Sequence, residues 1–186
     1  DKTNIKSYRP VALTSCLGKL LERIVSRRLT WKLHHDQIFF KSQCGFRPKC
    51  GTIDALLQIS EQCHEGIYNK EYTVVVLLDL EGAFDKVWWD GLVNKAAQIG
   101  ITGKMLRMIR SFLEDRSIQV QVDSHTSQKF NINTGTPQGA VLSPILFNIM
   151  MYDLPAIIPT SCLQVTDRKS TRLNSSHDQI SYAVFC

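Results

Sequence analysis

The stretch from Thr73 to Val87, with the sequence TVVVLLDLEGAFDKV, constrains the fold of this chain most strongly. A continuous apolar run rich in valine is typical of a strand that is covered on both faces. A single acid, Asp79, interrupts the run, and burying a lone carboxylate costs on the order of several kcal/mol unless a partner neutralises it. A divalent cation suits that task because hard cations prefer oxygen ligands. The stretch alone leaves two interpretations open: a metal ligand at a strand end, or an acid that caps the following turn.

Basic residues are concentrated in the first part of the chain. Residues 1–50 carry eleven Lys and Arg against three acids, whereas the remaining residues carry a net charge of −3. A basic N-terminal segment, followed by a segment that contains acidic residues, is typical of a protein that binds a polyanion beside a metal site. A solvated basic surface without a partner is the alternative. The length of 186 residues and the hydrophobic content of 44% are typical of one packed domain, or part of a larger one.

Several features bear on where such a chain resides. It has no run of eighteen apolar residues, and its first residues, DKTNIKSYRP, do not resemble a signal peptide. Without an initiating Met the sequence looks like an internal piece of a longer protein. Its six cysteines form no CxxC pair, which argues against a zinc site and favours reduced thiols. We therefore expect an intracellular protein of the nucleus and cytoplasm, without a membrane partner.

The first predicted helix runs from about residue 17 to residue 33, with Ser15 as a plausible N-cap. Its apolar residues recur at three- and four-residue steps, and charged residues that include Glu22, Arg27 and Arg28 fill the other face. The basic side of this helix could lie along a phosphate backbone. Ordinary solvated surface is the commoner explanation for any one helix.

Residues 43–51, QCGFRPKCG, form a predicted loop or tight hairpin because of their Gly and Pro content. Arg47 and Lys49 place fixed positive charge beside two glycines that permit close backbone approach. Phosphate recognition favours such a layout, since Arg offers a planar fork of donors. A basic surface turn explains the segment equally well.

The later elements follow from hydrophobic periodicity and from turn residues. Ser143 and Pro144 are expected at the N-cap and N1 positions of a helix that runs to about Tyr152. The other predicted elements are a helix at 52–68, a helix at 92–99 closed by Gly100, a helix capped by Thr102, a β-hairpin at 118–132, a glycine-flexed loop at 134–139 and a strand beginning at 163–165.

The last twenty residues, Asp167 to Cys186, break with everything before them. They lack helical or alternating periodicity until Ile180, and no partner element follows. Their back-translation is compatible with a short-read sequencing-library adaptor in two parts, separated by Asp178-Gln179 in place of a six-base index. We therefore expect the natural reading frame to end near Thr166 and treat residues 167–186 as an artefact rather than a domain.

Three stretches together resemble the reverse transcriptases of non-LTR (LINE-type) retrotransposons, most of all the jockey type. They are YRPVALTSCLGKLLERIVSRRL with QCGFRPKCGTIDAL, then VVVLLDLEGAFDKV, then GTPQGAVLSPILFNIMMYDLP. The resemblance runs from Ile5 to Val165, and the order and spacing of the stretches carry it. It implies an α+β fold over residues 1–166, namely the fingers and partial palm of a right-hand polymerase.

This resemblance also implies an activity, RNA-directed DNA synthesis from deoxynucleoside triphosphates on an RNA template and a DNA primer. Two Mg²⁺ ions, roughly 4 Å apart, would serve the intact enzyme. Asp79 matches the first metal-binding carboxylate of the family, which resolves the ambiguity left above, and the backbone carbonyl of Leu80 would assist.

Other matching residues would contact the nucleotide or the nucleic acid. Phe84 matches the aromatic residue beneath the incoming sugar, where a ring leaves no room for a 2′-hydroxyl; a core Phe is the alternative. Pro137, Gln138 and Gly139 match the loop that supports the template and the incoming base. Arg47 would contact the triphosphate or the nucleic acid. On the fingers side, Lys49, Arg27 and Arg28 would contact nucleic acid.

The chain departs from the family after Val165. There the family continues with Tyr-Ala-Asp-Asp, whose acids complete the metal site, whereas this sequence continues Thr166-Asp167-Arg168. We do not assign Asp167 that role, because its neighbours differ from the family pattern. We expect this polypeptide to lack polymerase activity, as well as a thumb and any endonuclease domain.

Three other interpretations compete with the enzyme fragment. A nucleic-acid-binding module derived from such an enzyme would need the basic fingers but not Asp79, Phe84 or Gln138. A non-functional remnant would be unstable, since its palm sheet would lack a strand. A group II intron maturase shares the fold but is less like the QCGFRPKCGTIDAL stretch.

Overall fold

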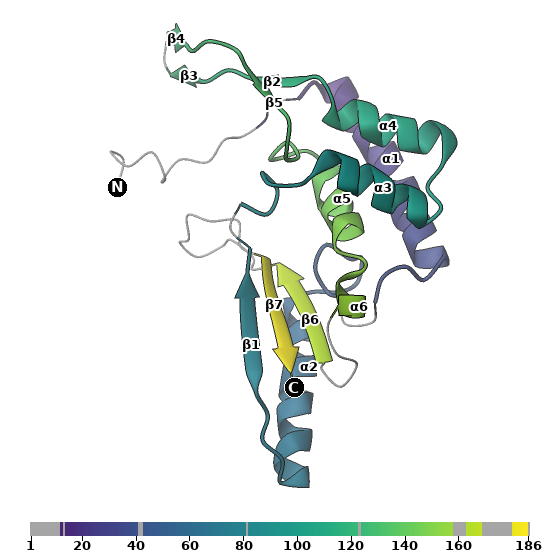
Figure 1. Ribbon diagram of the computed structural model, residues 1–186, viewed down its shortest axis with the longest axis vertical. Helices are drawn as coiled ribbons and strands as arrows, with labels where there is room; N and C mark the ends of the chain where they lie inside the picture. The colour runs from purple at the N-terminus through teal and green to yellow at the C-terminus, as the bar shows by residue number, and fades with distance from the viewer. Residues whose placement is uncertain are drawn as a thin grey trace.

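A computed structural model describes residues 12, 14–40, 43–80, 82–122, 124–157, 163–168 and 180–185. It is a mixed α and β structure, as the resemblance implies (Figure 1). Its helices are α1 (Cys16–His35), α2 (Thr52–Asn69), α3 (Trp89–Gln98), α4 (Gly103–Leu113), α5 (Ser143–Met150) and α6 (Leu154–Ile157). Its strands are β1 (Val75–Asp79), β2 (Arg116–Ile118), β3 (Gln121–Val122), β4 (His125–Thr126), β5 (Phe130–Ile132), β6 (Leu163–Arg168) and β7 (Ile180–Phe185).

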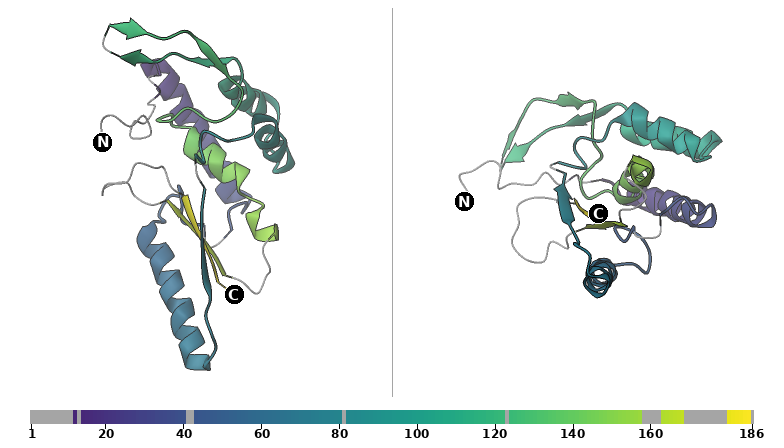
Figure 2. Two further views of the ribbon diagram at one scale, coloured as in Figure 1. Left: turned by 60° about the vertical axis from the view of Figure 1, so that its left-hand side comes forward. Right: turned by 60° about the horizontal axis from the view of Figure 1, so that its bottom comes forward.

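The largest sheet is antiparallel, with the strand order β1-β7-β6. Asp79 of β1 and Asp167 of β6 are both register partners of Ser181 in β7, so the three residues lie in one row across the sheet. Helix α2 packs against β6, and Figure 2 shows it along one side of the sheet, with the other long helices gathered away from it.

Strand β7 differs from the expectation that residues 167–186 contribute no partner element. Residues 180–185 form the central strand instead. Their sequence, ISYAVF, is rich in β-branched and aromatic residues, which favour strands. Hydrogen bonds between strands join backbone groups. Residues 180–185 can therefore pair as a strand even if an adaptor encodes them.

Strand β1 was expected to be covered on both faces, and this expectation is wrong. Val75 is 42% exposed and Leu77 is 73% exposed. The physical reason is its place in the sheet: β1 is an outer strand, and α2 packs on β6 at the other edge. A continuous apolar run is therefore not proof of a covered strand.

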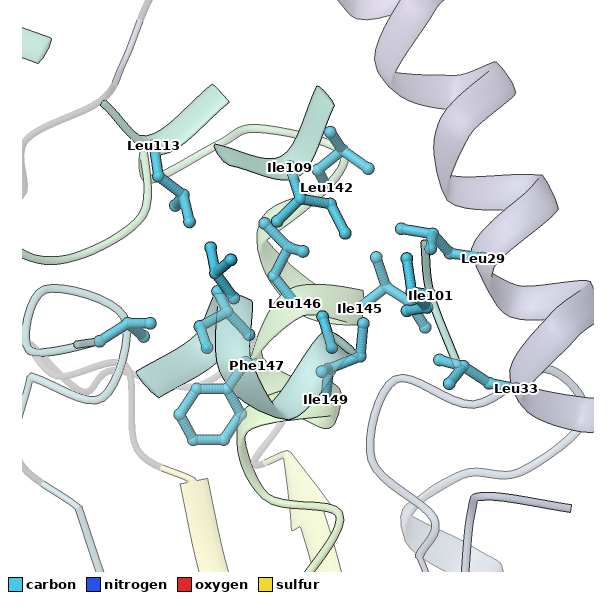
Figure 3. Close-up of a cluster of buried hydrophobic side chains, with 14 of the residues drawn as sticks. Leu29, Leu33, Ile101, Ile109, Leu113, Leu142, Ile145, Leu146, Phe147 and Ile149 are labelled. Atoms are coloured by element: carbon cyan, nitrogen blue, oxygen red, sulfur yellow. The ribbon is translucent and has the colours of Figure 1, made fainter. Parts of the chain in front are cut away.

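Most of the buried core lies among the helices rather than on the sheet. Helix α5 runs through its centre, and nearly all of its residues are buried (Figure 3). The fully buried large side chains come from four helices and the loops beside them: Leu29, Leu33, Leu92, Ile101, Ile109, Leu113, Leu142, Leu146 and Ile149. This core holds α1, α3, α4 and α5 together as one body.

Helix α1 begins as predicted but buries only the later part of the predicted apolar face. The Gly18 amide donates to Ser15 Oγ at 3.0 Å, which confirms the N-cap. However, Leu17 and Ile24 are exposed, whereas Glu22 is only 4% exposed. Glu22 stands three residues before Val25, and this spacing places it on the buried stripe of α1.

The predicted hairpin is confirmed, in two separate pieces. Strand β2 pairs with β5, and the short strand β3 pairs with β4. Among the helices, α3 begins at Trp89, earlier than expected, and is followed by Gly100 with a φ of +79°. Helix α4 follows Thr102 as predicted, although the Thr102 side chain makes no capping bond.

Helix α5 begins one residue earlier than the sequence suggests. Leu142 occupies the N-cap position, so Ser143 is N1 and Pro144 is N2. Ser143 Oγ donates to the Pro137 carbonyl at 2.8 Å instead of capping the helix. Capping of α5 therefore has to come from another part of the chain.

Candidate functional site

Strand β1 ends at Asp79 and leads into a tight turn. The amides of Asp85 and Lys86 both donate to the Gly82 carbonyl at 3.0 Å, and Gly82 has a φ of +63°. A left-handed conformation of this kind favours glycine. The turn places Phe84 and Asp85 immediately after the strand end that carries Asp79.

The loop at 134–139 docks onto this turn through backbone hydrogen bonds. The Gly135 amide donates to the Val87 carbonyl at 2.8 Å, and the Thr136 amide donates to the Phe84 carbonyl at 2.7 Å. Thr134 Oγ1 adds a longer contact of 3.3 Å to the Asp85 carbonyl. Two segments about fifty residues apart in the chain thus form one structural unit.

Two side chains from other elements also bind the 134–139 loop. Trp89 Nε1 donates to the Gly135 carbonyl at 2.7 Å, and Arg116 Nη1 donates to the same oxygen at 2.9 Å. Burial lowers the pKa of Arg116, because desolvation disfavours the charged guanidinium. The Gly135 carbonyl therefore joins α3 and β2 to the loop.

Gly135 is required for this close approach. Its φ is +79°, and a Cβ added there would lie 2.5 Å from the Asp85 carbonyl oxygen. A side chain would therefore collide with backbone that cannot rotate away. The glycine-flexed loop predicted from the sequence is confirmed, and the structure gives the reason for the glycine: the loop lies directly against the turn after β1.

The side chains of Gln138 and Asp85 form a contact between the 134–139 loop and the turn after β1. Gln138 Nε2 lies 3.1 Å from both carboxylate oxygens of Asp85, and both residues are accessible at the surface. Pro137 is buried, and Gly139 has a φ of +89°. The loop thus presents Gln138 and Gly139 beside the turn that follows Asp79. The sequence motif indicated Gln138 but gave no sign of its pairing with Asp85.

Phe84 lies in the hydrophobic core, with 7% of its surface exposed. Its ring meets the ring of Phe46 edge-on, with centroids 5.8 Å apart, and tilts against Phe147 at 5.4 Å. Both orientations are favourable for aromatic pairs. Most of the Phe84 ring is therefore engaged by protein, so only a small part of it can face a ligand.

Arg47 is engaged in packing within the fingers region. Its Nη1 donates to the Phe40 carbonyl at 3.2 Å, and its guanidinium lies 5.6 Å from the centroid of the Phe39 ring. Its Nε is buried without a hydrogen-bond partner. Desolvation and then the charge of Arg47 lower the pKa of His34, whose ring stacks edge-on against Phe39.

The other predicted nucleic-acid contacts are exposed. Arg27 and Arg28 lie on the outer surface of α1, and Lys49 lies on the 43–51 loop with a φ of +63°. All three side chains are accessible to a polyanion.

Glu22 is the site residue that sequence analysis missed. Its Oε2 accepts hydrogen bonds from the amides of Val141 and Leu142, at 2.6 Å and 3.2 Å. A carboxylate at a helix N-terminus satisfies free amides and complements the helix dipole. Glu22 therefore connects α1 to the start of α5, just after the Gln138 loop. Its helical spacing from Val25 and Leu29 was the signal available in the sequence.

Metal binding requires more ligands than the described residues bring together. Within the described part of the chain, no three His, Cys, Asp or Glu side chains gather in one place. A catalytic pair of hard cations needs several carboxylate oxygens. The residues described here do not complete such a set.

Comparison with known proteins identifies the family. The family described as "Reverse transcriptase (RNA-dependent DNA polymerase)" matches residues 1–184. The chain belongs to the reverse transcriptase family. Enzymes of this family generally use divalent metal ions.

The similar curated proteins come from mobile elements. The chain is 37% identical over 159 residues to the RNA-directed DNA polymerase from mobile element jockey of Drosophila melanogaster, covering 86% of this chain and 17% of that protein. It is 34% identical over 149 residues to the probable RNA-directed DNA polymerase from transposon X-element of the same species, covering 80% of this chain and 16% of that protein. The chain thus spans about a sixth of the length of these relatives.

A solved structure supports the fold. Apo telomerase from Candida tropicalis, truncated from its C-terminal domain, aligns with a TM-score of 0.57 at 15% identity, over 89% of this chain and 34% of that one. The α+β expectation and the non-LTR, jockey-like resemblance are both confirmed. Among the described residues, no helix has the length and hydropathy needed to cross a lipid bilayer.

Proposed function

We propose that this chain is the nucleotide- and template-binding part of an RNA-directed DNA polymerase from a non-LTR retrotransposon, comprising the fingers and part of the palm. The single observation that carries the proposal is the docking of the 134–139 loop onto the turn after β1. It brings Gln138 beside the turn that follows Asp79, although the two segments are far apart in sequence. An incoming nucleotide would bind between these elements.

The substrates we propose are deoxynucleoside triphosphates, with an RNA template and a DNA primer. Mg²⁺ is the proposed metal, because carboxylate, water and phosphate oxygens suit it. Asp79 would supply one carboxylate and Leu80 a backbone carbonyl. In the intact enzyme, positioned cations would stabilise the charge of phosphoryl transfer. We assign to this chain the binding and positioning of the nucleotide and the nucleic acid.

Each loop residue has a proposed task. Gln138 would hydrogen-bond the template or the incoming base, and Gly139 and Pro137 would shape the backbone that lies against it. Phe84 would lie beneath the sugar, with the small part of the residue that is exposed, and disfavour a 2′-hydroxyl. Arg47 would act indirectly: its guanidinium bonds the Phe40 carbonyl and lies over the Phe39 ring, so it would support the fingers instead of contacting phosphate.

The nucleic-acid backbone would lie on the basic fingers. Arg27, Arg28 and Lys49 are exposed cations, and each phosphate contact releases counterions. Replacing one of them by Ala should weaken binding of any sequence and reduce the slope of log affinity against log salt by about one. We also propose, from the composition alone, that the protein resides in the nucleus and cytoplasm.

A binding experiment tests the proposal directly. The full 186-residue chain would be titrated into a labelled DNA primer annealed to RNA, with and without Mg²⁺ and a matching deoxynucleotide, while fluorescence anisotropy is recorded. We expect binding that the matching nucleotide strengthens in Mg²⁺, that Asp79→Asn weakens, and that produces no primer extension. Exposed Asp90 in α3, changed to Asn, is the matched control. Failure of the matching nucleotide to strengthen binding would refute the nucleotide site.

One alternative has an observation in its favour. The outer surface of α1 carries exposed Arg27 and Arg28 and no exposed acid, which would suffice for a simple nucleic-acid-binding module. Binding to RNA that ignores Mg²⁺ and survives Asp79→Ala would favour this module over the enzyme fragment.

A further inference from the structure

We infer that Asp85 is a positioning residue that determines which end of the Gln138 carboxamide faces the nucleic acid. This inference rests on the proposed function, in which the 134–139 loop lies against a template or incoming base. Gln138 is the loop residue whose side chain can both donate and accept hydrogen bonds. Its usefulness in recognition therefore depends on its orientation.

Asp85 controls the orientation because a carboxylate accepts hydrogen bonds and does not donate them. Both of its oxygens lie 3.1 Å from Gln138 Nε2. Rotating the amide by half a turn would bring Gln138 Oε1 against the carboxylate, where two acceptors repel one another. Nε2 is therefore held at Asp85, and Oε1 is left free as an acceptor for an N–H or O–H group of a base or sugar.

The backbone of the loop is held independently of this pair. Gly135 and Thr136 donate to the turn after β1, and the Ala12 amide donates to the Gln138 carbonyl at 2.9 Å. Because these bonds do not involve the Asp85 carboxylate, a change in that carboxylate alters the side-chain orientation while the loop stays docked. The pair thus has a role in recognition that is separable from the fold.

The substitution Asp85→Asn tests the orientation of the Gln138 carboxamide without changing the docking of the loop backbone. Asn has nearly the same size as Asp, but it offers both a donor and an acceptor, so it can pair with either orientation of the Gln138 amide. Asp85→Glu keeps the acceptor-only character and should restore most of the effect. Asp90→Asn, an exposed acid in α3, controls for the loss of one negative charge.

A first measurement follows the Gln138 amide itself in the ¹⁵N-labelled full chain. Its NH₂ resonances are assigned by their loss in Gln138→Met. We expect Asp85→Asn to shift or broaden them, and Asp85→Glu and Asp90→Asn to leave them near the parent positions. Unchanged Gln138 resonances in Asp85→Asn would overturn the inference, whether or not the chain binds nucleotide.

A second measurement uses a double-mutant cycle on binding of the matching deoxynucleotide with RNA–DNA primer-template. We expect Asp85→Asn to weaken nucleotide binding by about three- to tenfold, the range for one hydrogen bond. The double variant Asp85→Asn/Gln138→Met should bind no more weakly than Gln138→Met alone. Additive losses would overturn the inference. A parent chain that binds no nucleotide would refute the proposed function, while the resonances of Gln138 still decide the role of Asp85.

Discussion

The carboxylate of Glu22 accepts a 2.6 Å hydrogen bond from the amide of Val141, 119 residues later in the chain. Glu22 lies in α1, and Val141 lies between the Gln138 loop and α5. The bond fixes the start of α5 against α1 and so helps to hold the loop in place. A charged side chain that is 4% exposed would otherwise be costly, but here it accepts from two amides at the entry to α5.

Replacing Glu22 by Ala should lower the free energy of unfolding by about 2–3 kcal/mol, because one part-buried and one buried amide lose their acceptor. Glu22→Gln should cost less, since its amide oxygen still accepts. Urea denaturation followed by circular dichroism measures both. Glu61→Ala, an exposed acid in α2, is the control and should change stability little. Equal losses for Glu22→Ala and Glu61→Ala would contradict the capping role.

Gly135→Ala should be among the most damaging single changes in the chain. The new Cβ would lie 2.5 Å from the Asp85 carbonyl oxygen at a φ of +79°, so the loop would have to move off the turn. We expect a loss of about 3 kcal/mol or more in unfolding free energy. Gly103→Ala is the matched comparison, since Gly103 also has a positive φ but would meet no atom within 4 Å.

For Gly103→Ala we expect only the backbone cost of a left-handed Ala, about 1 kcal/mol. Thermal or urea unfolding of the two variants side by side separates steric contact from backbone conformation. Similar stabilities would mean that the loop does not lie against the turn in solution.

Trp89→Phe should remove one hydrogen bond while keeping an aromatic ring. The lost donor is Nε1, which lies 2.7 Å from the Gly135 carbonyl. We expect about 1 kcal/mol of destabilisation and faster amide hydrogen exchange at Gly135 and Thr136. Trp88→Phe is the neighbouring control, because Trp88 is 59% exposed and should have a smaller effect on those amides.

The pH dependence of stability should carry a contribution from His34. Desolvation and Arg47 lower its pKa in the folded chain, so the unfolded chain binds a proton more readily. Stability from this residue is present above the ordinary histidine pKa and is lost as the pH falls through the lowered folded value. Because the ring is largely exposed, the effect should be small.

Urea midpoints measured between pH 7.5 and pH 5 test this expectation. The parent chain should lose stability toward the acid end more steeply than His34→Gln. A steeper loss in the variant would contradict the assignment.

Much of the fold followed from local sequence signals. Helix α1 with its Ser15 cap, α4 after Thr102 and the strand at β1 were all predicted from periodicity and cap residues. What failed was burial: Glu22 is covered and Leu77 is exposed. Burial depends on which elements meet in space, and a local pattern does not specify its partner.

In the candidate site, too, local motifs were predictable from the sequence, whereas contacts between distant segments were not. The resemblance singled out Asp79 and Gln138 by their motifs, but the pairing of Gln138 with Asp85 is a contact between segments 53 residues apart. The packing of Arg47 on Phe39 was also out of reach, since a basic loop residue is usually solvated. Motifs thus identified the residues, whereas the tertiary structure identified which of them are in contact.

The outer strand of the sheet has a practical consequence for handling the protein. In the described part of the chain, β1 pairs with β7 along one edge only, and its Val and Leu side chains are largely accessible to water. Open strand edges with apolar neighbours template the addition of further strands. Concentrated samples should therefore aggregate through β1, and a lysine placed at Leu77 should keep the chain in solution.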